Sequence, residues 1–533
     1  MDRRRLKYLV LIIIPLALSC YTHLWNLLGF PSIHIDEAHY MRRTMSVLQG
    51  YGPQEGGPQA YPRLYDHPYF GQLFMSGFLS LVGYPDSLNP GTDENSIKTL
   101  HLAPRLLIGL VAIFDTFLIF KISERRYHNL TIAFAASIIF AVMPSTWIFR
   151  RVYLDTILLP FLLSSILIAI YVKKASSDNS KVAQDTLSKF TIHKNILILL
   201  SGILMGLAIY TKIPAFSFIP LVATLIFFNS GKSLKAIGIW FIPVIMLPLL
   251  WPTYSIITNQ TDLWLYWALW QTDRGDRPIS TSLSNILYLD PLVSILGMAG
   301  IIIATLRRDF FVLLWIIPFL ILSYAIGWVQ YFHLAPILLA LCISSGTSID
   351  YLRKIISKYC TKYSNILSYT PLAAVIIFGL ICTSMLITLD VNSAYYKIFS
   401  TIAQKIPDSE NNSKITLIGS HWWVWDTQWI TNYVLNKSHL LIDPHLDPKF
   451  NTKISTDKVL IVGDPIFEDS LSRRLNSDNL RQIRQLYNQS TVIASFTDNV
   501  TTSTSPYYPF NTIPIMIWNE NHPTGKIYIK SNY

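Results

Sequence analysis

The chain has 533 residues, of which 51% are hydrophobic and only 14% are charged, and its mean hydropathy is +0.37. This composition excludes an ordinary soluble protein and indicates a polytopic membrane protein. The net charge of +11 would suggest a nucleic-acid partner in a soluble domain, but the basic residues gather in short loops between apolar runs and act there as topology signals. The four cysteines lie in or beside hydrophobic segments without metal-type spacing, so neither disulfides nor a zinc cluster is expected.

The first apolar run follows a basic start, with four basic residues among the first seven. The run extends from residue 8 to about residue 30 and is long enough to cross about 30 Å of hydrocarbon. A basic start favours a cytoplasmic N-terminus. A signal peptide cleaved near residues 17–20 is the alternative, but the apolar character continues past that point.

Residues 31–100 form a long first outer loop that is rich in glycine, proline, tyrosine and acidic residues. A loop of this length is more than a passive connector and is a candidate for function. Within it, the apolar stretch from Leu73 to Gly83 is predicted to form an amphipathic helix that lies on the membrane surface.

Ten further apolar runs follow before residue 390, which predicts about eleven transmembrane helices. Clusters of lysine and arginine fall in every second loop, as the positive-inside rule requires for a cytoplasmic N-terminus. They lie near residues 121–126, 173–194, 232–235, 307–308 and 353–362. An odd number of crossings places the C-terminus outside. We therefore predict a multi-pass protein of the cell membrane with an extracytoplasmic C-terminal part.

The composition becomes polar after about residue 390. Short β-like runs at Ile415–Ile418 and Val459–Val462 alternate there with helix-compatible segments. We predict two domains, a transmembrane part over residues 1–390 and a soluble α/β domain over residues 391–533. The aromatic segment 421–426 is expected to pack in the core of the second domain, and a surface that presents the acceptor is the alternative.

Candidate reactive groups lie where the membrane meets water on the outer side, because ions deeper in lipid are costly unless they have a function. Asp36 and Glu37 follow the first apolar run directly. Neighbouring residues point in different directions on a helix or a strand, so the two carboxylates are expected to have different roles. The structural alternative is that both acids open an interfacial helix, whose N-terminus favours negative charge.

Further charged residues occupy segments that the same alternation of loops places outside. Arg150 and Arg151 lie there against the positive-inside rule, next to Asp155, and indicate an anionic partner. Snorkelling topology residues are the alternative for the two arginines. Lys212 stands at another outer junction, where it could bind a phosphate or serve as an ordinary loop residue.

Four motifs follow one another in the first 220 residues: Asp36-Glu37 after the first span, Asp66-His67-Pro68 before the amphipathic stretch, Arg150-Arg151 with Asp155, and Gly206 to Lys212. This order resembles the protein O-mannosyltransferase family and its relatives, including the aminoarabinose transferases that act on lipid A. The resemblance implies a polytopic α-helical protein with the C-type membrane glycosyltransferase fold. It also implies a polyprenyl- or dolichyl-phosphate sugar as donor and a protein, lipid or glycan as acceptor. No cofactor is implied, and the need for a divalent metal stays open.

The resemblance also implies roles for individual residues. Asp36 is similar to the family's catalytic aspartate, the base that takes the acceptor proton, and Glu37 to its neighbouring carboxylate. Arg150 or Arg151 would match the arginine that meets the donor phosphate, and Lys212 a lysine that shares the phosphate. The residues expected to support them are His39, Asp66, His67 and Asp155. An inverting displacement needs a base at the attacking hydroxyl and cations at the departing phosphate, which agrees with these roles.

The acceptor stays open, because the sequence lacks the lectin-like insertion of the eukaryotic mannosyltransferases and has Tyr69 where they have a second proline. The leading hypothesis is transfer of a single, mannose-like sugar on the outer face. An oligosaccharyltransferase is the second, but it needs a lipid diphosphate, a divalent metal and an Asp-X-Asp type of carboxylate set, to which Asp273 and Asp276 come nearest. A flippase should have pseudo-symmetric halves, and the long first loop argues against one. A receptor or scaffold would leave the outer arginines unexplained.

Overall fold

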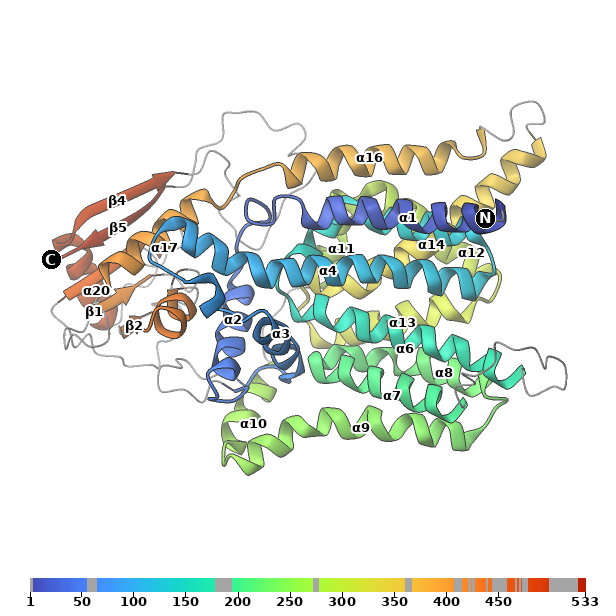
Figure 1. Ribbon diagram of the computed structural model, residues 1–533, viewed down its shortest axis with the longest axis horizontal. Helices are drawn as coiled ribbons and strands as arrows, with labels where there is room; N and C mark the ends of the chain where they lie inside the picture. Colours follow the sequence, from blue (N-terminus) through green and yellow to red (C-terminus); the bar gives the residue numbers. More distant parts are fainter. Residues whose placement is uncertain are drawn as a thin grey trace.

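The computed structural model is mostly helical and carries a small sheet near the C-terminus (Figure 1). It describes residues 3–54, 65–177, 194–271, 278–359, 367–406, 415–419, 423, 427–437, 440–442, 458–464, 467–468, 471, 478–497 and 526–533. The molecule is elongated, and its two termini lie at opposite ends. Asp273 and Asp276, and most of the aromatic segment 421–426, lie outside the described residues.

Seven helices of the described part are long and apolar enough to cross a membrane. They are α1 (Arg3–Leu24), α4 (Glu94–Tyr127), α6 (Leu154–Ser177), α7 (Lys194–Thr211), α9 (Leu234–Ile257), α14 (Ala335–Tyr359) and α16 (Thr370–Ile387). Two bent pairs raise the number to nine if each pair is one span. These pairs are α5 (Leu130–Val142) with η2 (Pro144–Arg150), and α11 (Ile279–Leu289) with α12 (Pro291–Leu306).

Three shorter apolar segments accompany these spans, and one of them, Phe70–Leu81, covers most of the stretch predicted to lie on the membrane surface. The other two are η3 (Ile213–Phe218) with α8 (Ile219–Asn229), and the 17-residue helix α13 (Phe310–Ile326). A helix of 17 residues covers about 25 Å, close to the thickness of the hydrocarbon core. If both segments also cross, the protein has the eleven crossings expected from the sequence. By length and composition alone, the described residues contain seven to nine membrane-crossing helices.

The last turns of α4 lie at the end of the bundle that carries the N-terminus (Figure 1). Lys121, near the end of α4, donates to the Tyr8 hydroxyl at 2.8 Å. Arg125, in the last turn of α4, donates to the Tyr171 hydroxyl of α6 at 3.0 Å. The ends of α4 and α6 therefore lie beside the start of α1, as the alternation of basic loops predicts. Which side of the membrane this end faces stays a prediction.

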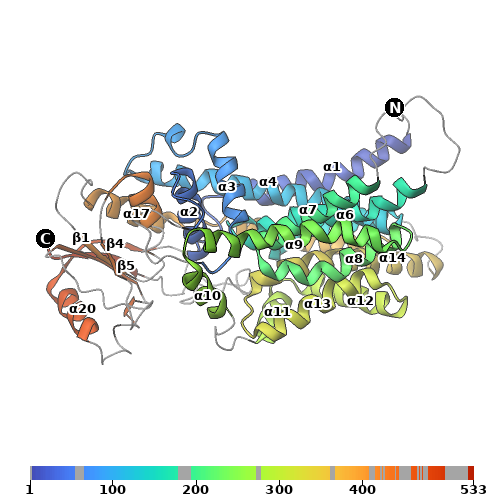
Figure 2. The ribbon, with the colours of Figure 1, turned by 90° about the horizontal axis from the view of Figure 1, so that it is seen from below.

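The opposite end holds the short helices and the C-terminal domain (Figures 1 and 2). The short helices are α2 (Ile35–Leu48), α3 (Phe70–Leu81) and α10 (Thr261–Trp270). Helix α3 occupies most of the stretch predicted to be amphipathic. A described three-residue turn, η1 (Asp86–Leu88), follows it, and η4 (Tyr331–Leu334) precedes α14.

The C-terminal domain begins with α17 (Ser393–Lys405) and contains a five-stranded sheet with the order β2-β1-β3-β5-β4. Its strands are β1 (Ile415–Ile418), β2 (Leu440–Ile442), β3 (Lys458–Gly463), β4 (Thr491–Thr497) and β5 (Lys526–Ser531). Strands β2, β1 and β3 are parallel, whereas β5 pairs antiparallel with β3 and β4. Helix α20 (Asp478–Gln489) and the π-helix η5 (Gln428–Val434) complete the described elements. The predicted α/β character and the two predicted strands are confirmed.

Helix α7 is packed tightly against α9 through two glycines four residues apart. A Cβ atom at Gly206 would lie 2.5 Å from the backbone oxygen of Pro243, and one at Gly202 would lie 2.3 Å from that of Trp240. The lack of a side chain lets the two backbones approach, as in other small-residue helix contacts. Because α7 ends directly before Lys212, this contact also fixes where Lys212 is presented.

The glycine contact gives a matched prediction on stability. Gly206→Ala should lower the thermal unfolding temperature in detergent, because overpacking costs about 1–3 kcal/mol. Gly238→Ala on α9 is the control, since a Cβ there has no neighbour within 4 Å and alanine is the better helix former by about 1 kcal/mol. Equal unfolding temperatures for the two variants would contradict the close α7–α9 contact.

Candidate functional site

The adjacent acids lie in the first turn of α2, so the helix-opening role considered from the sequence is present. His34 is the N-cap, and its Nδ1 accepts a hydrogen bond from the Asp36 backbone N–H at 3.2 Å. The Glu37 Oε1 accepts from the His34 backbone N–H at 3.2 Å, which closes a capping box. This reciprocal arrangement fixes the direction in which the two carboxylates leave the helix.

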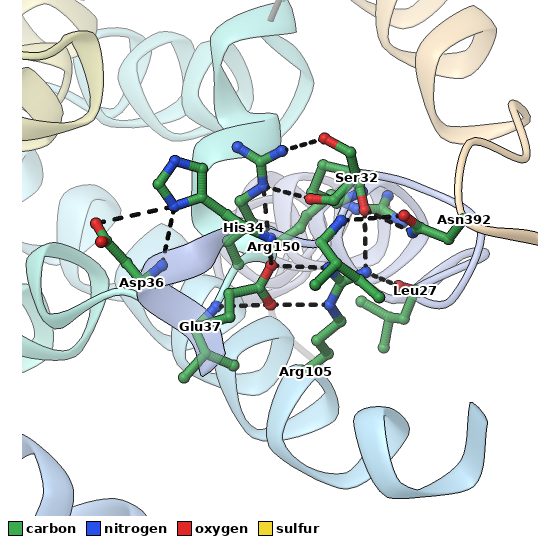
Figure 3. A network of polar contacts seen from close by, with 12 residues as sticks. Leu27, Ser32, His34, Asp36, Glu37, Arg105, Arg150 and Asn392 are labelled. Atoms are coloured by element: carbon green, nitrogen blue, oxygen red, sulfur yellow. Dashed lines mark hydrogen bonds and ion pairs between the residues drawn. The ribbon is translucent and has the colours of Figure 1, made fainter. Parts of the chain in front are cut away.

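The two carboxylates point to different sides of the start of α2 (Figure 3). Glu37 is buried and accepts from Arg105 through both oxygens, Nε to Oε2 at 3.0 Å and Nη2 to Oε1 at 2.8 Å. The Asp36 side chain is 29% exposed, against 5% for the side chains of Glu37 and Asp155 and 10% for Asp66. Asp36 is therefore the most open of these four carboxylates and the one best placed to meet a substrate.

Arg105 is the principal residue that sequence reasoning missed. Besides Glu37, it donates through Nη1 to the carbonyl oxygens of Leu27 at 2.8 Å and Pro31 at 3.0 Å. It thus ties the loop after α1 to helix α4. The sequence did contain a signal for Arg105, because an arginine within an apolar run of membrane length is costly and marks a functional or structural site.

Arg150 faces the main chain at the end of α1. Its guanidinium donates to the carbonyl oxygens of Thr22 at 2.6 Å, Phe30 at 3.0 Å and Trp25. The last carbonyls of a helix lack intrahelical partners and carry partial negative charge, so a cation is favourable there. In this structure Arg150 anchors the end of α1, and its role at the donor phosphate stays a prediction.

Arg151 is held by the loop and by two tyrosines. It donates to the Ser32 carbonyl at 2.9 Å and the Ser32 hydroxyl at 2.5 Å. It also donates to the hydroxyls of Tyr153 at 3.1 Å and Tyr331 at 3.3 Å, and its Nε lies 3.9 Å from Glu37 Oε1. Of the two adjacent carboxylates at the start of α2, Glu37 is thus the one that faces the arginines. Neither tyrosine was singled out from the sequence.

Lys212 and Asp155 form a buried ion pair, with Nζ 2.5 Å from Oδ2. The ammonium lies 5.8 Å from the ring centre of Phe332, which stacks on Tyr153 at 4.7 Å. A lysine ammonium has three N–H donors. Among the described residues, Asp155 is its one hydrogen-bond partner, so donors remain for an anionic ligand.

The predicted supporting residues His39, Asp66 and His67 are brought together around one carboxylate. Asp66 is 2.5 Å from Arg43 Nη2, 3.4 Å from His39 Nε2 and 3.7 Å from His67 Nε2. Burial would raise the pKa of Asp66, but Arg43, His67 and His39 outweigh burial and hold its pKa well below the ordinary value of 3.8. Gln271, after α10, donates to the Asp66 carbonyl at 3.0 Å.

The phenol of Tyr40, on α2, is affected by the charges of three of these carboxylates. Burial raises the pKa of its phenol well above the ordinary value of 10.0, and the charges of Asp36, Asp155 and Asp66 raise it further. The three carboxylates therefore all lie within electrostatic reach of one side chain. In the described part of the chain, no three histidine, cysteine, aspartate or glutamate side chains converge as a metal-binding group.

The C-terminal domain also contacts α2. Arg42 Nη1 donates to Gln428 Oε1 at 2.5 Å, and Gln49 Nε2 donates to the Tyr433 carbonyl at 2.5 Å, both partners lying on η5. Trp423 of the aromatic segment is buried and donates to Asp464 at 2.8 Å. This described residue of the segment is thus part of a packed core.

The different burial of Asp36 and Glu37 predicts different effects on stability. Glu37→Gln should lower the free energy of unfolding by about 3–5 kcal/mol, because it leaves the buried Arg105 without its charged partner. The control is Glu94→Gln, which removes a part-exposed pair with Lys98 and should cost less than about 1 kcal/mol. Thermal unfolding in detergent measures the stability of both variants. A Glu37→Gln variant as stable as Glu94→Gln would contradict the role of Glu37 as the charged partner of the buried Arg105.

The lowered pKa of Asp66 predicts a pH dependence of stability. The stabilisation from its ionised form is fully present above about pH 3.8, the ordinary value, and is lost as pH falls through the lower native value. Asp66→Asn should therefore lower the unfolding temperature at pH 7, and its difference from wild type should shrink below about pH 3.8. A constant difference over a pH series of melting curves would count against this network.

No family model matches the chain, and the search of curated proteins gives no match. The structure is similar to ArnT from Cupriavidus metallidurans in the apo state, with a TM-score of 0.59, 11% identity and coverage of 100% of this chain and 99% of that chain. For the same protein bound to undecaprenyl phosphate, the TM-score is 0.54 at 11% identity, with 99% and 98% covered.

The apo oligosaccharyltransferase of Archaeoglobus fulgidus has a TM-score of 0.51 and 12% identity over 81% of this chain. This chain spans 64% of the length of that protein. The C-type glycosyltransferase fold implied by the sequence motifs is confirmed, including the likeness to an aminoarabinose transferase. At these identities the likeness establishes the fold.

Proposed function

We propose that the protein is an inverting glycosyltransferase of the cell membrane. It moves a single, mannose-like sugar from a polyprenyl- or dolichyl-phosphate donor to a protein, lipid or glycan acceptor on the outer face. In this proposal the N-terminus is cytoplasmic, and the C-terminal domain is extracytoplasmic. The observation that carries it is the juxtaposition of the part-exposed Asp36 with the Lys212–Asp155 pair. Phe332 links the two groups, because its ring lies 5.8 Å from the Lys212 ammonium and 5.7 Å from the ring of His34, which is 3.8 Å from Asp36.

The chemistry assigns opposite tasks to these groups. The acceptor hydroxyl oxygen attacks the anomeric carbon of the sugar, and Asp36 takes the hydroxyl proton. The bond between the anomeric carbon and the phosphate oxygen breaks, and the lipid phosphate leaves with the electron pair. Lys212 stabilises the charge that develops on this phosphate with its remaining N–H donors. Attack from the face opposite the phosphate inverts the anomeric centre.

The other predicted residues are given positioning roles. Glu37, held by Arg105, fixes the first turn of α2 from which Asp36 projects. Arg151 orders Tyr153 and Tyr331 beside the same turn.

The end of α1 and the segment before α3 are each held by a separate set of contacts. Arg150 holds the end of α1. His39, His67 and Arg43 surround Asp66 and hold the segment before α3 against α2.

The decisive test is transfer by purified protein in liposomes that contain a radiolabelled polyprenyl-phosphate sugar. Asp36→Asn should reduce kcat by at least about 100-fold, the usual contribution of a positioned general base. Thermal unfolding should stay close to that of wild type, because the Asp36 side chain is part-exposed. Asp86→Asn, at an exposed acid of η1, is the control that should leave transfer unchanged. Undiminished transfer by Asp36→Asn would overturn the proposed base.

The same assay separates the alternatives. Loss of transfer in the presence of a chelator, with a lipid-diphosphate donor preferred, would favour an oligosaccharyltransferase. Label that crosses the bilayer without transfer to an acceptor would favour a flippase. A panel of mannose, other hexose and pentose donors then identifies the sugar.

A further inference from the structure

The residue that caps α2 is unusual for its position. Serine, threonine, aspartate and asparagine are the preferred N-caps, because a short side chain accepts from the first backbone N–H groups. Here the cap is His34, whose Nδ1 accepts from the Asp36 N–H at 3.2 Å and lies 3.8 Å from Asp36 Oδ2 (Figure 3). A titratable ring therefore contacts both the backbone and the carboxylate of the proposed base.

The His34 ring is buried between two aromatic side chains. Tyr153 meets it edge to face at 5.3 Å, and Phe332 does so at 5.7 Å between ring centres. Helix α2 contributes two acids near the ring, Asp36 and Glu37. The segment before α6 contributes Tyr153 and Arg151, and η4 contributes Tyr331. Lys212 lies beyond Phe332. The packing leaves the ring little freedom to rotate away from Asp36.

The hydrogen bond defines which form of the ring the active arrangement needs. A ring nitrogen that accepts a hydrogen bond carries no proton, so in the neutral ring the proton is on Nε2. A proton added at Nδ1 removes the acceptor for the Asp36 N–H. It also places a positive charge 3.8 Å from the Asp36 carboxylate, which stabilises the ionised acid and makes it a weaker base.

We propose that His34 is a positioning residue and an acid switch for Asp36. Neutral His34 holds the first turn of α2 so that Asp36 can take the acceptor proton. Uptake of one proton from solvent converts the cap into a cation paired with Asp36 and turns transfer off. This inference rests on the proposed function, because it concerns the same carboxylate.

The pH profile of transfer tests the switch. An unperturbed histidine side chain titrates between about pH 5 and 8, and the ¹³C titration of His34 gives the midpoint in this protein. Wild-type kcat/KM should fall about tenfold per pH unit on the acid side of this titration. In His34→Asn the cap is a preferred residue that cannot be protonated, so activity at pH 7.5 should stay within about threefold of wild type and the acid loss should disappear.

Two further variants complete the test. His34→Ser provides a second cap without a titratable ring and should give the same flat profile. His128→Asn is the matched control, because His128 is exposed, lies at the basic end of the bundle and has a positive φ of 49° that asparagine tolerates. It should keep the wild-type acid loss. An acid loss in His34→Asn equal to that of wild type would overturn the inference.

A readout that needs no activity separates this inference from the proposed function. In protein with ¹³C-labelled histidine, the Cε1 signal that is missing from His34→Asn reports the titration of His34. Asp36→Asn should move its midpoint to lower pH, because removing a neighbouring negative charge disfavours the imidazolium. An unchanged midpoint would refute the coupling. Absence of sugar transfer combined with a shifted midpoint would reject the function and keep the His34–Asp36 pair.

Discussion

The buried ion pair between Glu37 and Arg105 is the interaction on which the end of the molecule that carries α2 depends. Both side chains are withdrawn from water, so the two-bond geometry and the additional hydrogen bonds must compensate for their desolvation. Arg105 also holds the carbonyls of Leu27 and Pro31, which fixes the loop after α1 against α4. The start of α2 is thereby set by a span of the bundle, and the direction of Asp36 follows from it.

A second residue also anchors the loop after α1. Asn392, before α17, accepts from the Ile33 N–H at 3.0 Å and donates to the carbonyls of Leu28 at 2.9 Å and Pro31 at 2.8 Å. Together with the contact between Arg42 and η5, it holds α2 between the membrane bundle and the C-terminal domain. The C-terminal domain is therefore part of the scaffold that positions α2, the helix that carries Asp36.

The sequence predicted what depends on local pattern. Apolar runs of membrane length located the spans, short β-branched runs located β1 and β3, and helical periodicity separated Asp36 from Glu37. The sequence could not predict contacts between residues far apart in the chain, such as the pairing of Glu37 with Arg105, 68 residues away. The adjacent arginines 150 and 151 look equivalent in sequence, but one faces helix-end carbonyls and the other faces Ser32 and two tyrosines. Only the packing of α1 against η2 makes that distinction.

In the proposed function, the charges around Lys212 account for a buried cation that is stable before the donor binds. Lys212 is neutralised by Asp155, so the resting site holds a pair instead of an isolated charge, which would be far more costly to bury. A phosphate that binds the remaining N–H donors would share the ammonium with Asp155 and add negative charge beside Phe332, whose ring also meets His34, the neighbour of Asp36. Added negative charge disfavours ionised Asp36 and strengthens it as a base. Donor binding would thus prepare the carboxylate for the proton that the acceptor must lose.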